Sequence, residues 1–497
     1  MSHVIALADL LKNIVDVPPA HDLDVSSMTQ DSREVEVGCL FVALKGMQQH
    51  GMAYAVRAEM LGAVAIIYEA DESLEPVETN IPQFEIADLR DSLGLVADRF
   101  YGSPSQSLQM VGITGTDGKT SVSHFMAQAI NNCAVIGTIG LGLLDNLQKA
   151  THTTPDVINV HKNLLAMKQQ GVATVAMEVS SHALDQGRVA GVAFDVAVLT
   201  NLTRDHLDYH KTVEAYADAK EKLFHWSNLK AVVLNLDDEF GRKVAQKVSE
   251  SQAVVGYGVG KSENYPAGSL VAVDAKFTAN GIFAVVEYGT QSAQLAVSVL
   301  GKFNLSNLLA ALGAMLALGF AFSDAILQLN KVKTVAGRME KVGGVLSKSI
   351  LTVVDFAHTP NALESVLKAL RDHMENGSNE LICVFGCGGD RDAGKRPLMA
   401  AVAEKYADVV IVTDDNPRTE SPEAIVKDIM LGFADQEKIM IEHDRSAAIY
   451  KALKQAKSGD AVLIAGKGHE TGQILATGTI SFNDREQVEQ ALQELAA

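Results

Sequence analysis

Short apolar runs alternate with segments of helical periodicity along most of this chain. Through the middle of the chain, the apolar runs predict strands at 108–114, 134–139, 173–179, 194–200, 230–236 and 253–258. The periodic segments between them predict helices at 118–131, 156–169, 212–224 and 238–248. Strands that alternate with helices indicate a mostly parallel sheet with right-handed crossovers. Ligands of such sheets bind where the strands end, so the polar residues that follow each strand are the candidates for function.

The two ends of the chain show related patterns. Residues 1–104 read as a small α/β unit, which by itself is equally typical of a folding or docking module, and a linker follows at 101–105. Short antiparallel strands are expected at 271–277, 281–288 and 293–300, before a long apolar helix at 305–318. The last part repeats the α/β alternation, with strands at 351–356, 380–386, 408–413, 438–442 and 460–465 and helices at 361–374, 396–406, 421–433, 445–457 and 484–495. We therefore predict an α/β protein with domains at 1–104, 105–335 and 336–497.

Composition narrows the possible functions. A chain of 497 residues is too long for one hydrophobic core, and its net charge of −19 argues against nucleic acid or anionic membranes as partners. The four cysteines show neither metal-ligand spacing nor a disulfide framework, which favours buried thiols in a reducing cytosol. The first residues lack the pattern of a signal peptide, and no apolar run approaches the ~20 residues that span a bilayer. We expect a cytoplasmic protein without membrane insertion.

The stretch from Val111 to Ser121 has the pattern of a phosphate-binding loop. An apolar run leads to Gly115, and Gly118-Lys119-Thr120 then opens a helical segment. Backbone N–H groups at the helix start would face an anion, while the lysine would reach the terminal phosphates and the threonine hydroxyl could hold Mg²⁺. Because Ile113 stands where the first glycine of this motif belongs, an ordinary glycine-rich turn is the alternative.

Polar residues also follow the next predicted strands. Glu178 closes the run 173–179, where a carboxylate can bind Mg²⁺ beside phosphates. Residues 200–210 are dense in His and Asp, although a solvated loop would also be polar. Lys220 lies in an amphipathic helix, and its spacing alone predicts an exposed lysine.

Four polar turns follow strands of the third region, at 354–360, 386–392, 414–418 and 466–470. Arg391 and Arg418 can each pair with a carboxylate, whereas Asp415 and Glu470 can receive an ammonium group. A rim with both signs of charge suits a zwitterion, so we expect it to bind an amino acid. The alternative is four independent structural turns.

Together these motifs resemble those of the Mur ligases, ATP-dependent enzymes that form amide bonds in peptidoglycan synthesis. The shared features occur in order over nearly the whole chain, at 115–120, 153–154, 178–182, 201–210, 216–220, 303–308, 337–340, 357–360 and 466–470. The resemblance implies a small N-terminal α/β domain that binds UDP and a central P-loop ATPase domain with a mostly parallel sheet plus a small antiparallel sheet. It further implies a Rossmann-like C-terminal domain that binds the amino acid.

The resemblance also implies roles for single residues. Catalysis would depend on Lys119, Lys220, His206 and His358, and Mg²⁺ would be held by Thr120, Glu178, His206 and a carbamylated Lys220. ATP would be bound by Gly115, Thr116, Asp117, Gly118, Lys119, Thr120, Ser121, Asn304, Arg338 and Asp355. The UDP-sugar peptide would meet Ser32, the loop from Met47 to Gln49, Thr153, Thr154, Ser180, Gln186 and Arg188. The amino acid would be held by Arg391, Asp415, Asn416, Pro417, Arg418, Gly466 and Glu470.

Within the family, the turn 415–418 is similar to that of members that add meso-diaminopimelate to UDP-N-acetylmuramoyl-L-alanyl-D-glutamate, and lysine-adding members would lack Arg418. These two small molecules are therefore the expected substrates, and we expect a monomer. In the implied reaction, the peptide carboxylate attacks the γ-phosphate of ATP, and the amine of the amino acid then attacks the acyl phosphate.

Three positions depart from the family pattern. Asp117 stands where Asn is usual, Phe356 replaces a usual Tyr, and the loop 46–51 lacks an Asp-Gly pair. One alternative is therefore a diverged relative or related ligase that uses a different amino acid. A non-catalytic nucleotide sensor is another, and the set of Lys119, Thr120, Glu178 and Lys220 argues against it.

Overall fold

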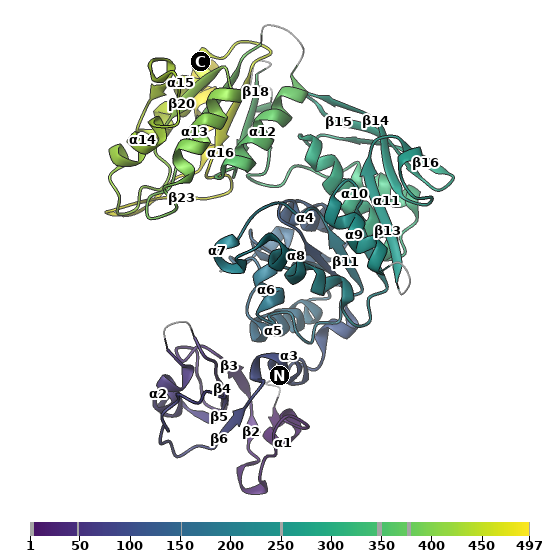
Figure 1. Cartoon of the computed structure of the whole chain (residues 1–497), viewed down its shortest axis with the longest axis vertical. Coiled ribbons are helices and arrows are strands. Elements are labelled where there is room, and N and C mark those ends of the chain that lie inside the picture. The colour runs from purple at the N-terminus through teal and green to yellow at the C-terminus, as the bar shows by residue number, and fades with distance from the viewer. Residues whose placement is uncertain are drawn as a thin grey trace. The chain divides into compact units, whose positions relative to one another are not determined.

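The structure is a computed structural model that describes residues 4–46, 49–150, 152–248, 252–344, 350–374 and 379–496. Its residues form two compact units, one of Met1–Leu234 with Asp238–Val255 and one of Asn235–Asp237 with Gly256–Ala497. Figure 1 draws both. The domain borders at 104 and 335 stay predictions.

The first unit begins with a parallel sheet in the order β3-β4-β5-β6, with β3 at Ser27–Thr29, β4 at Cys39–Ala43, β5 at Ala63–Glu69 and β6 at Gln83–Ile86. Helices α1 (Leu7–Leu10), α2 (Ala55–Leu61) and α3 (Leu89–Phe100) accompany it, with a short antiparallel pair of β1 (Ile5–Ala6) and β2 (Asp24–Val25). All five residues of β4 are buried, and the apolar residues of this region form two hydrophobic clusters. The predicted small α/β unit is confirmed.

The rest of the first unit contains a second sheet in the order β12-β11-β7-β10-β8-β9. Five strands run parallel, namely β12 (Ala231–Asn235), β11 (Val196–Leu199), β7 (Gln109–Thr114), β10 (Thr174–Glu178) and β8 (Cys133–Ile136). The short β9 (Leu141–Leu143) pairs antiparallel to β8. The helices are α4 (Lys119–Ala129), α5 (Val157–Gln169), α6 (Ser181–Asp185), α7 (Leu207–His210), α8 (Val213–Glu221) and α9 (Glu239–Val248). β7, which ends at the phosphate loop, lies between β11 and β10, so the turns after these three strands meet at one edge of the sheet.

The second unit starts with β13 (Ala253–Val259), which pairs parallel with β14 (Leu270–Thr278). Antiparallel pairing continues to β15 (Gly281–Tyr288) and β16 (Gln291–Val297), as predicted. Helix α10 (Lys302–Ala317) begins earlier than its predicted start at 305, and α11 (Phe322–Leu329) follows it.

The remainder of the second unit is an α/β sheet in the order β17-β18-β22-β19-β20-β21. The parallel strands are β18 (Leu351–Asp355), β22 (Ala461–Ala465), β19 (Leu381–Phe385), β20 (Val409–Val412) and β21 (Met440–Ile441), and β17 (Glu340–Val342) is antiparallel. Its helices are α12 (Pro360–His373), α13 (Lys395–Tyr406), α14 (Pro422–Met430), α15 (Arg445–Gln455) and α16 (Asp484–Ala496). One hydrophobic cluster contains residues of α12, α13 and α14, and another contains residues of α15 and α16.

Several starts and ends of elements follow from local chemistry. Thr359 and Ser421 cap α12 and α14 through their hydroxyls, and a proline occupies the first helical position of each. A hairpin of β23 (Gly472–Leu475) and β24 (Gly478–Ser481) was not predicted, because its alternation is short and largely polar. In the described parts of the chain, no helix is both long and apolar enough to cross a membrane.

Candidate active site

The predicted phosphate loop joins β7 to α4. Gly115 and Gly118 adopt positive φ of 147° and 87°. A Cβ at Gly115 would lie 1.8 Å from the Thr200 hydroxyl oxygen, so only glycine fits there. The Lys119 ammonium folds back over the loop and donates to the carbonyls of Gly115 and Thr116 at 2.8 and 2.7 Å. Strand, glycine turn, lysine and helix N-terminus are therefore arranged as a phosphate cradle requires.

The turn after β11 supports this loop from the side. Asn201 accepts from the backbone N–H of Asp117 through Oδ1 at 3.0 Å, and its carbonyl accepts from Thr116 N–H at 2.9 Å. The Thr200 hydroxyl donates to the carbonyl of Asp117 at 2.6 Å. Asp117 is therefore held through its backbone, and its exposed carboxylate is not needed for the shape of the loop. Asp117 thus departs from the family pattern without disturbing the loop.

Lys220 is buried beside the same loop, with 1% of its surface exposed. Its ammonium donates to the Gly115 carbonyl at 2.8 Å, the oxygen that Lys119 also binds, and it lies 4.5 Å from the centre of the Tyr216 ring. Burial, together with the nearby Lys119 charge, holds the pKa of Lys220 well below its usual value. The exposed position that its spacing suggested is wrong, because Lys220 faces the loop from the buried side of α8.

Glu178 ends β10 and is also buried, with 1% of its surface exposed. Its carboxylate accepts from the Thr138 N–H at 3.0 Å and from the Thr138 hydroxyl at 3.1 Å. Sequence reasoning missed Thr138, whose hydroxyl also lies 3.0 Å from that of Thr153. The Thr154 hydroxyl donates to the Glu178 carbonyl at 2.8 Å, so three predicted site residues form one network.

The residues at this edge fit a magnesium ion that is shared with phosphates. Among the described residues, no cationic side chain pairs with Glu178, and no cluster of three or more His, Cys, Asp or Glu side chains could hold a metal ion by itself. Mg²⁺ typically binds one or two carboxylates and completes its shell with water and substrate phosphates. A buried, cation-free carboxylate and the Thr120 hydroxyl at the start of α4 suit that arrangement.

His206 lies in a cluster of aromatic rings. Its ring centre is 4.9 Å from that of His182 and 6.0 Å from that of Tyr216, and the Asp205 carboxylate is 3.4 Å from its Nε2. His206 has a φ of 52°, which is uncommon for a residue with a side chain. Burial and the neighbouring histidines lower the pKa of His182, which sequence reasoning had noted only as part of a motif.

Two adjoining cavities are lined by four of the residues predicted to meet the UDP-sugar peptide, namely Ser32, Gln49, Gln186 and Arg188. The larger, about 840 Å³, includes Ser32 and Gln49, whereas Met47 and Gln48 lie outside the described residues. The smaller, about 290 Å³, includes Gln186 and Arg188. Both cavities are lined by Gln30, Leu44, Arg90, His152 and Asp156. A groove therefore leads from Ser32 to Arg188, whose guanidinium donates to the Thr154 carbonyl at 3.0 Å.

Ser180 is positioned by its local structure. It caps α6, and its backbone N–H donates to the Thr154 hydroxyl at 3.1 Å. The structure therefore brings Thr153, Thr154, Ser180 and Glu178 together in one unit with the phosphate loop. Arg188 and Gln186 are paired with each other, which fixes both side chains at the groove.

Asn304, Arg338 and Asp355, predicted at the nucleotide, lie in the second unit. The Asp355 carboxylate accepts from the N–H groups of Met339 and Ala357 at 2.6 and 2.7 Å, and burial raises its pKa. The Arg338 guanidinium lies 4.8 Å from the centre of the Phe356 ring. Phe356 thus offers the aromatic face that a tyrosine would, without its hydroxyl.

Asn304 and His358 differ in accessibility. Asn304 is 1% exposed, and its amide donates to the Leu300 carbonyl at 2.7 Å. His358 is exposed, with Nδ1 2.9 Å from the carbonyl of Phe356, so its ring is oriented by its own turn.

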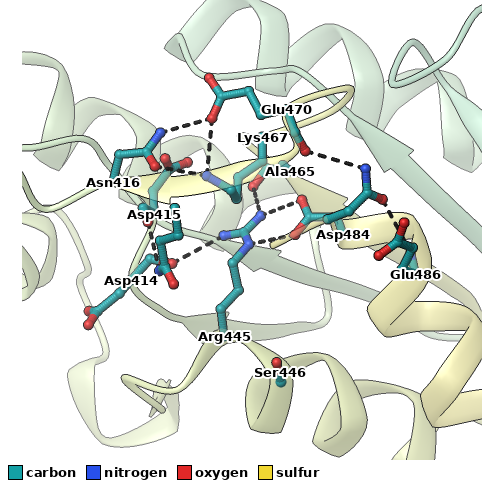
Figure 2. Close-up of polar contacts among 12 residues, drawn as sticks. Asp414, Asp415, Asn416, Arg445, Ser446, Ala465, Lys467, Glu470, Asp484 and Glu486 are labelled. Carbon is teal, nitrogen blue, oxygen red and sulfur yellow. Dashed lines mark hydrogen bonds and ion pairs between the residues drawn. The ribbon is translucent and has the colours of Figure 1, made fainter. Parts of the chain in front are cut away.

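Two residues of the predicted amino-acid site, Asn416 and Glu470, are connected through Lys467 at the strand ends of the second unit (Figure 2). The Asn416 amide donates to the Glu470 carboxylate at 2.9 Å. The Lys467 ammonium donates to the Asn416 oxygen at 2.9 Å and to the same Glu470 oxygen at 3.1 Å. The side chain of Lys467 is 0% exposed. It was seen in the sequence only as part of a glycine-rich turn, because a lysine is rarely fully buried.

The Arg418 side chain is oriented by its backbone and by the contact of one guanidinium nitrogen. It has a φ of 55°, its N–H donates to the Ile474 carbonyl at 3.0 Å, and Nη1 donates to the Gly389 carbonyl at 2.8 Å. Within the described residues, the hydrogen bonds of its side chain all come from Nη1, so Nε and Nη2 remain for a ligand. Arg391 lies in the adjoining turn and is exposed. A Cβ at Gly389 would lie 2.0 Å from the Pro417 carbonyl, so these two turns pack closely.

A buried ion pair lies next to this network, and the sequence did not reveal it. Arg445 and Asp484, each 0% exposed in its side chain, form two hydrogen bonds of 2.7 and 2.8 Å. Arg445 also donates to the Ala465 carbonyl at 3.0 Å (Figure 2). A Cβ at Gly466 would lie 2.4 Å from the Asp415 carboxylate, which explains this glycine, and burial raises the pKa of Asp415. Each partner of the ion pair begins a helix and looks like an ordinary surface charge in the sequence.

The chain belongs to the Mur ligase family. Three models of that family match it: the catalytic domain of the Mur ligase family at 24–101, the Mur ligase middle domain at 113–315 and the Mur ligase glutamate ligase domain at 337–468. The predicted fold class is thereby confirmed.

Two sequence relatives and one solved structure share the same protein name. UDP-N-acetylmuramoyl-L-alanyl-D-glutamate–2,6-diaminopimelate ligase of Pseudomonas aeruginosa is 47% identical over 475 residues, covering 95% of this chain and 96% of the relative. The protein of that name from Coxiella burnetii is 43% identical, with the same coverage of 95% and 96%. A solved structure of that name superposes with a TM-score of 0.74 at 35% identity, covering 99% of this chain and 100% of the other. The fold is also that of MurF ligase from Thermotoga maritima in complex with ADP. That structure superposes with a TM-score of 0.61 at 22% identity, covering 94% of this chain and 98% of the other.

Proposed function

We propose that this chain is an ATP-dependent ligase that joins meso-diaminopimelate to UDP-N-acetylmuramoyl-L-alanyl-D-glutamate and releases ADP and phosphate. The observation that carries the proposal is the 47% identity over 95% of the chain to a protein of that name, combined with an intact phosphate loop and a rim of both charge signs. The substrates are small molecules.

Phosphate chemistry is assigned to the loop 115–121. The N-terminus of α4 and the Lys119 ammonium bind the phosphates. When the nucleotide binds, the ammonium leaves the two carbonyls that it now contacts and binds the phosphates instead. There it offsets negative charge as the γ-phosphoryl group transfers. Mg²⁺, which would be held by Thr120, Glu178, His206 and modified Lys220, would supply further neutralisation of the phosphate oxygens. Ser121 follows in the first turn of α4 and is buried there.

Lys220 carries a carbamate in the active enzyme, on this proposal. A depressed pKa leaves more of the amine neutral, and a neutral amine nitrogen attacks the carbon of CO₂ and then loses a proton. The product is an anion where the unmodified chain has a largely neutral amine beside Lys119. The negative charge would attract the Lys119 ammonium, and the carbamate would supply an oxygen that could help to hold Mg²⁺.

The UDP-sugar peptide occupies the groove that leads from Ser32 to Arg188. Its uridine end lies near Ser32, and its peptide end lies near Thr153, Thr154, Ser180 and Arg188, at the side of the sheet that carries the phosphate loop. The terminal carboxylate thereby approaches the γ-phosphate, as an acyl-phosphate reaction requires.

Meso-diaminopimelate binds at the network of Asn416, Arg418 and Glu470. Nε and Nη2 of Arg418 form a pair of donors for the second carboxylate of meso-diaminopimelate, which lysine lacks. Arg391 lies in the adjoining turn. Asp415, Pro417 and Gly466 shape the turns that hold this edge in place. Glu470 receives the ammonium group on its second oxygen, since Lys467 and Asn416 share the first. His358 lies in a neighbouring strand-end turn.

Phosphate release tests the proposal. ATP, the UDP-linked dipeptide and meso-diaminopimelate are supplied together and then with each omitted in turn, and mass spectrometry identifies the product. Release should require all three, give the UDP-linked tripeptide and fall on the order of 10²-fold or more in a folded Lys119→Ala variant. Steady phosphate release without either co-substrate, and without tripeptide, would show a different enzyme.

A further inference from the structure

His373 is a buried histidine whose two ring nitrogens both bind backbone groups outside its own helix. It is the last residue of α12 and is 2% exposed. The Gly301 N–H donates to Nε2 at 2.8 Å, and Nδ1 lies 2.6 Å from the carbonyl oxygen of Thr278. Thr278 ends β14 and Gly301 directly precedes α10, so residues from three elements of the second unit meet at this ring.

These two contacts fix the protonation of the ring. A backbone N–H only donates, so Nε2 must be the acceptor, and a carbonyl only accepts, so Nδ1 must carry the proton. His373 is therefore a neutral imidazole with one defined tautomer. Burial lowers its pKa and favours the same neutral form.

The backbone that His373 holds leads directly to Asn304. Leu300 is 1% exposed and belongs to the hydrophobic cluster that contains Leu363 and Leu370 of α12. The Leu300 carbonyl accepts from the Asn304 amide at 2.7 Å, and the Gly301 carbonyl accepts from the Asn304 N–H at 2.8 Å. Helix α12 thus holds the turn 300–304 by apolar packing and through His373, and the turn holds both the backbone and the side chain of Asn304.

We propose that His373 is a positioning residue for the nucleotide, which acts through the Gly301 N–H to fix the turn that carries Asn304. The inference rests on the proposed function and on the expectation from the family resemblance that Asn304 binds ATP. His373 itself touches neither the nucleotide nor the reacting atoms. Its contribution should therefore be seen in the KM for ATP and not in the KM for the amino acid, which is bound by turns after other strands.

Two amide substitutions separate the contacts of the two ring nitrogens. In His373→Gln the amide reaches about as far as Nε2, so its oxygen can still accept from Gly301. In His373→Asn the amide ends near the position of Nδ1, so it can donate to the Thr278 carbonyl but leaves the Gly301 N–H buried without an acceptor. Both variants have a neutral amide side chain, so each is the control for the other.

Steady-state kinetics of the full chain with ATP, the UDP-linked dipeptide and meso-diaminopimelate distinguish the outcomes. We expect His373→Asn to raise the KM for ATP about tenfold, His373→Gln to raise it less than about threefold, and both to leave the KM for meso-diaminopimelate within about twofold. Equal effects of the two variants, or equal effects on both KM values, would overturn the proposal. A wild-type chain that releases no phosphate would instead contradict the proposed function.

Hydrogen exchange keeps the inference testable if His373→Asn does not fold or the chain shows no turnover. The Gly301 amide should be strongly protected in the wild type and in His373→Gln. If His373→Asn folds, its Gly301 amide should exchange about tenfold or more faster than in the wild type, while the exchange of the amides of α13 stays unchanged. Rapid exchange of the Gly301 amide in the wild type would show that the histidine does not hold this turn.

Discussion

Replacing Gly115 by alanine tests the phosphate loop most sharply. The new Cβ would lie 1.8 Å from the Thr200 hydroxyl oxygen and 3.0 Å from the Asn201 carbonyl oxygen, and the residue would keep a φ of 147°. A left-handed backbone costs an alanine roughly 1–2 kcal/mol. Displacing Thr200, whose hydroxyl donates to the Asp117 carbonyl, adds roughly 1–3 kcal/mol for overpacking and a disturbed hydrogen bond. We expect a total loss of about 2–5 kcal/mol in the free energy of unfolding.

Gly102→Ala is a matched control in the same unit. Gly102 also has a positive φ, 69°, but a Cβ there would meet no atom within 4 Å. Its replacement should therefore cost only about 1 kcal/mol, because backbone strain is partly offset by the lower entropy of the unfolded chain.

Urea unfolding followed by circular dichroism, with ATP affinity measured by calorimetry at low temperature, compares the two variants. Gly115→Ala should lose both stability and measurable ATP binding, whereas Gly102→Ala should bind ATP like the wild type. If Gly115→Ala were as stable as Gly102→Ala and bound ATP normally, the packing of the loop against Thr200 would not matter as argued.

Three further substitutions test other parts of the site. Lys220→Ala should abolish phosphate release, and added formate or acetate should restore part of it; no restoration with a folded protein would count against a carbamate. Lys467→Met should raise the KM for meso-diaminopimelate about tenfold or more and leave the KM for ATP unchanged, because Glu470 loses its buried cation; an unchanged KM would remove Lys467 from the site. Asp484→Asn should lower the free energy of unfolding by about 3–5 kcal/mol, since the Arg445 charge stays buried, and a loss below about 1 kcal/mol in urea titrations would refute this.

The sequence predicted the parallel sheets and the places where polar side chains gather, since buried strands give continuous apolar runs. Lys119, Glu178 and Arg418 were found because each lies at the end of such a run or in the turn that follows it. The starts of helices were less certain: α10 begins at Lys302 because Gly301 ends the preceding turn, and a polar Lys302 does not extend the apolar pattern.

Residues that act through burial could not be found from local pattern. Lys220 has the spacing of an exposed lysine, yet it is buried because the loop after β7 covers that side of α8, a long-range contact. The same holds for Lys467, Arg445 and Asp484. In the sequence they resemble exposed charges, and their partners lie far away along the chain, so their contacts follow only from the order of the strands. His373 ends an amphipathic helix, and only the tertiary structure gives it two backbone partners.

The central claim concerns the amino acid, and the ratio of kcat/KM for meso-diaminopimelate to that for L-lysine tests it most directly. Arg418 is anchored through Nη1, and its other guanidinium edge would be left without a partner when lysine binds. The account predicts a preference for meso-diaminopimelate of up to ~10⁴-fold, which Arg418→Ala greatly reduces and Arg418→Lys does not restore, because a lysine cannot form the paired geometry. Equal use of L-lysine and meso-diaminopimelate by the wild-type chain would contradict it.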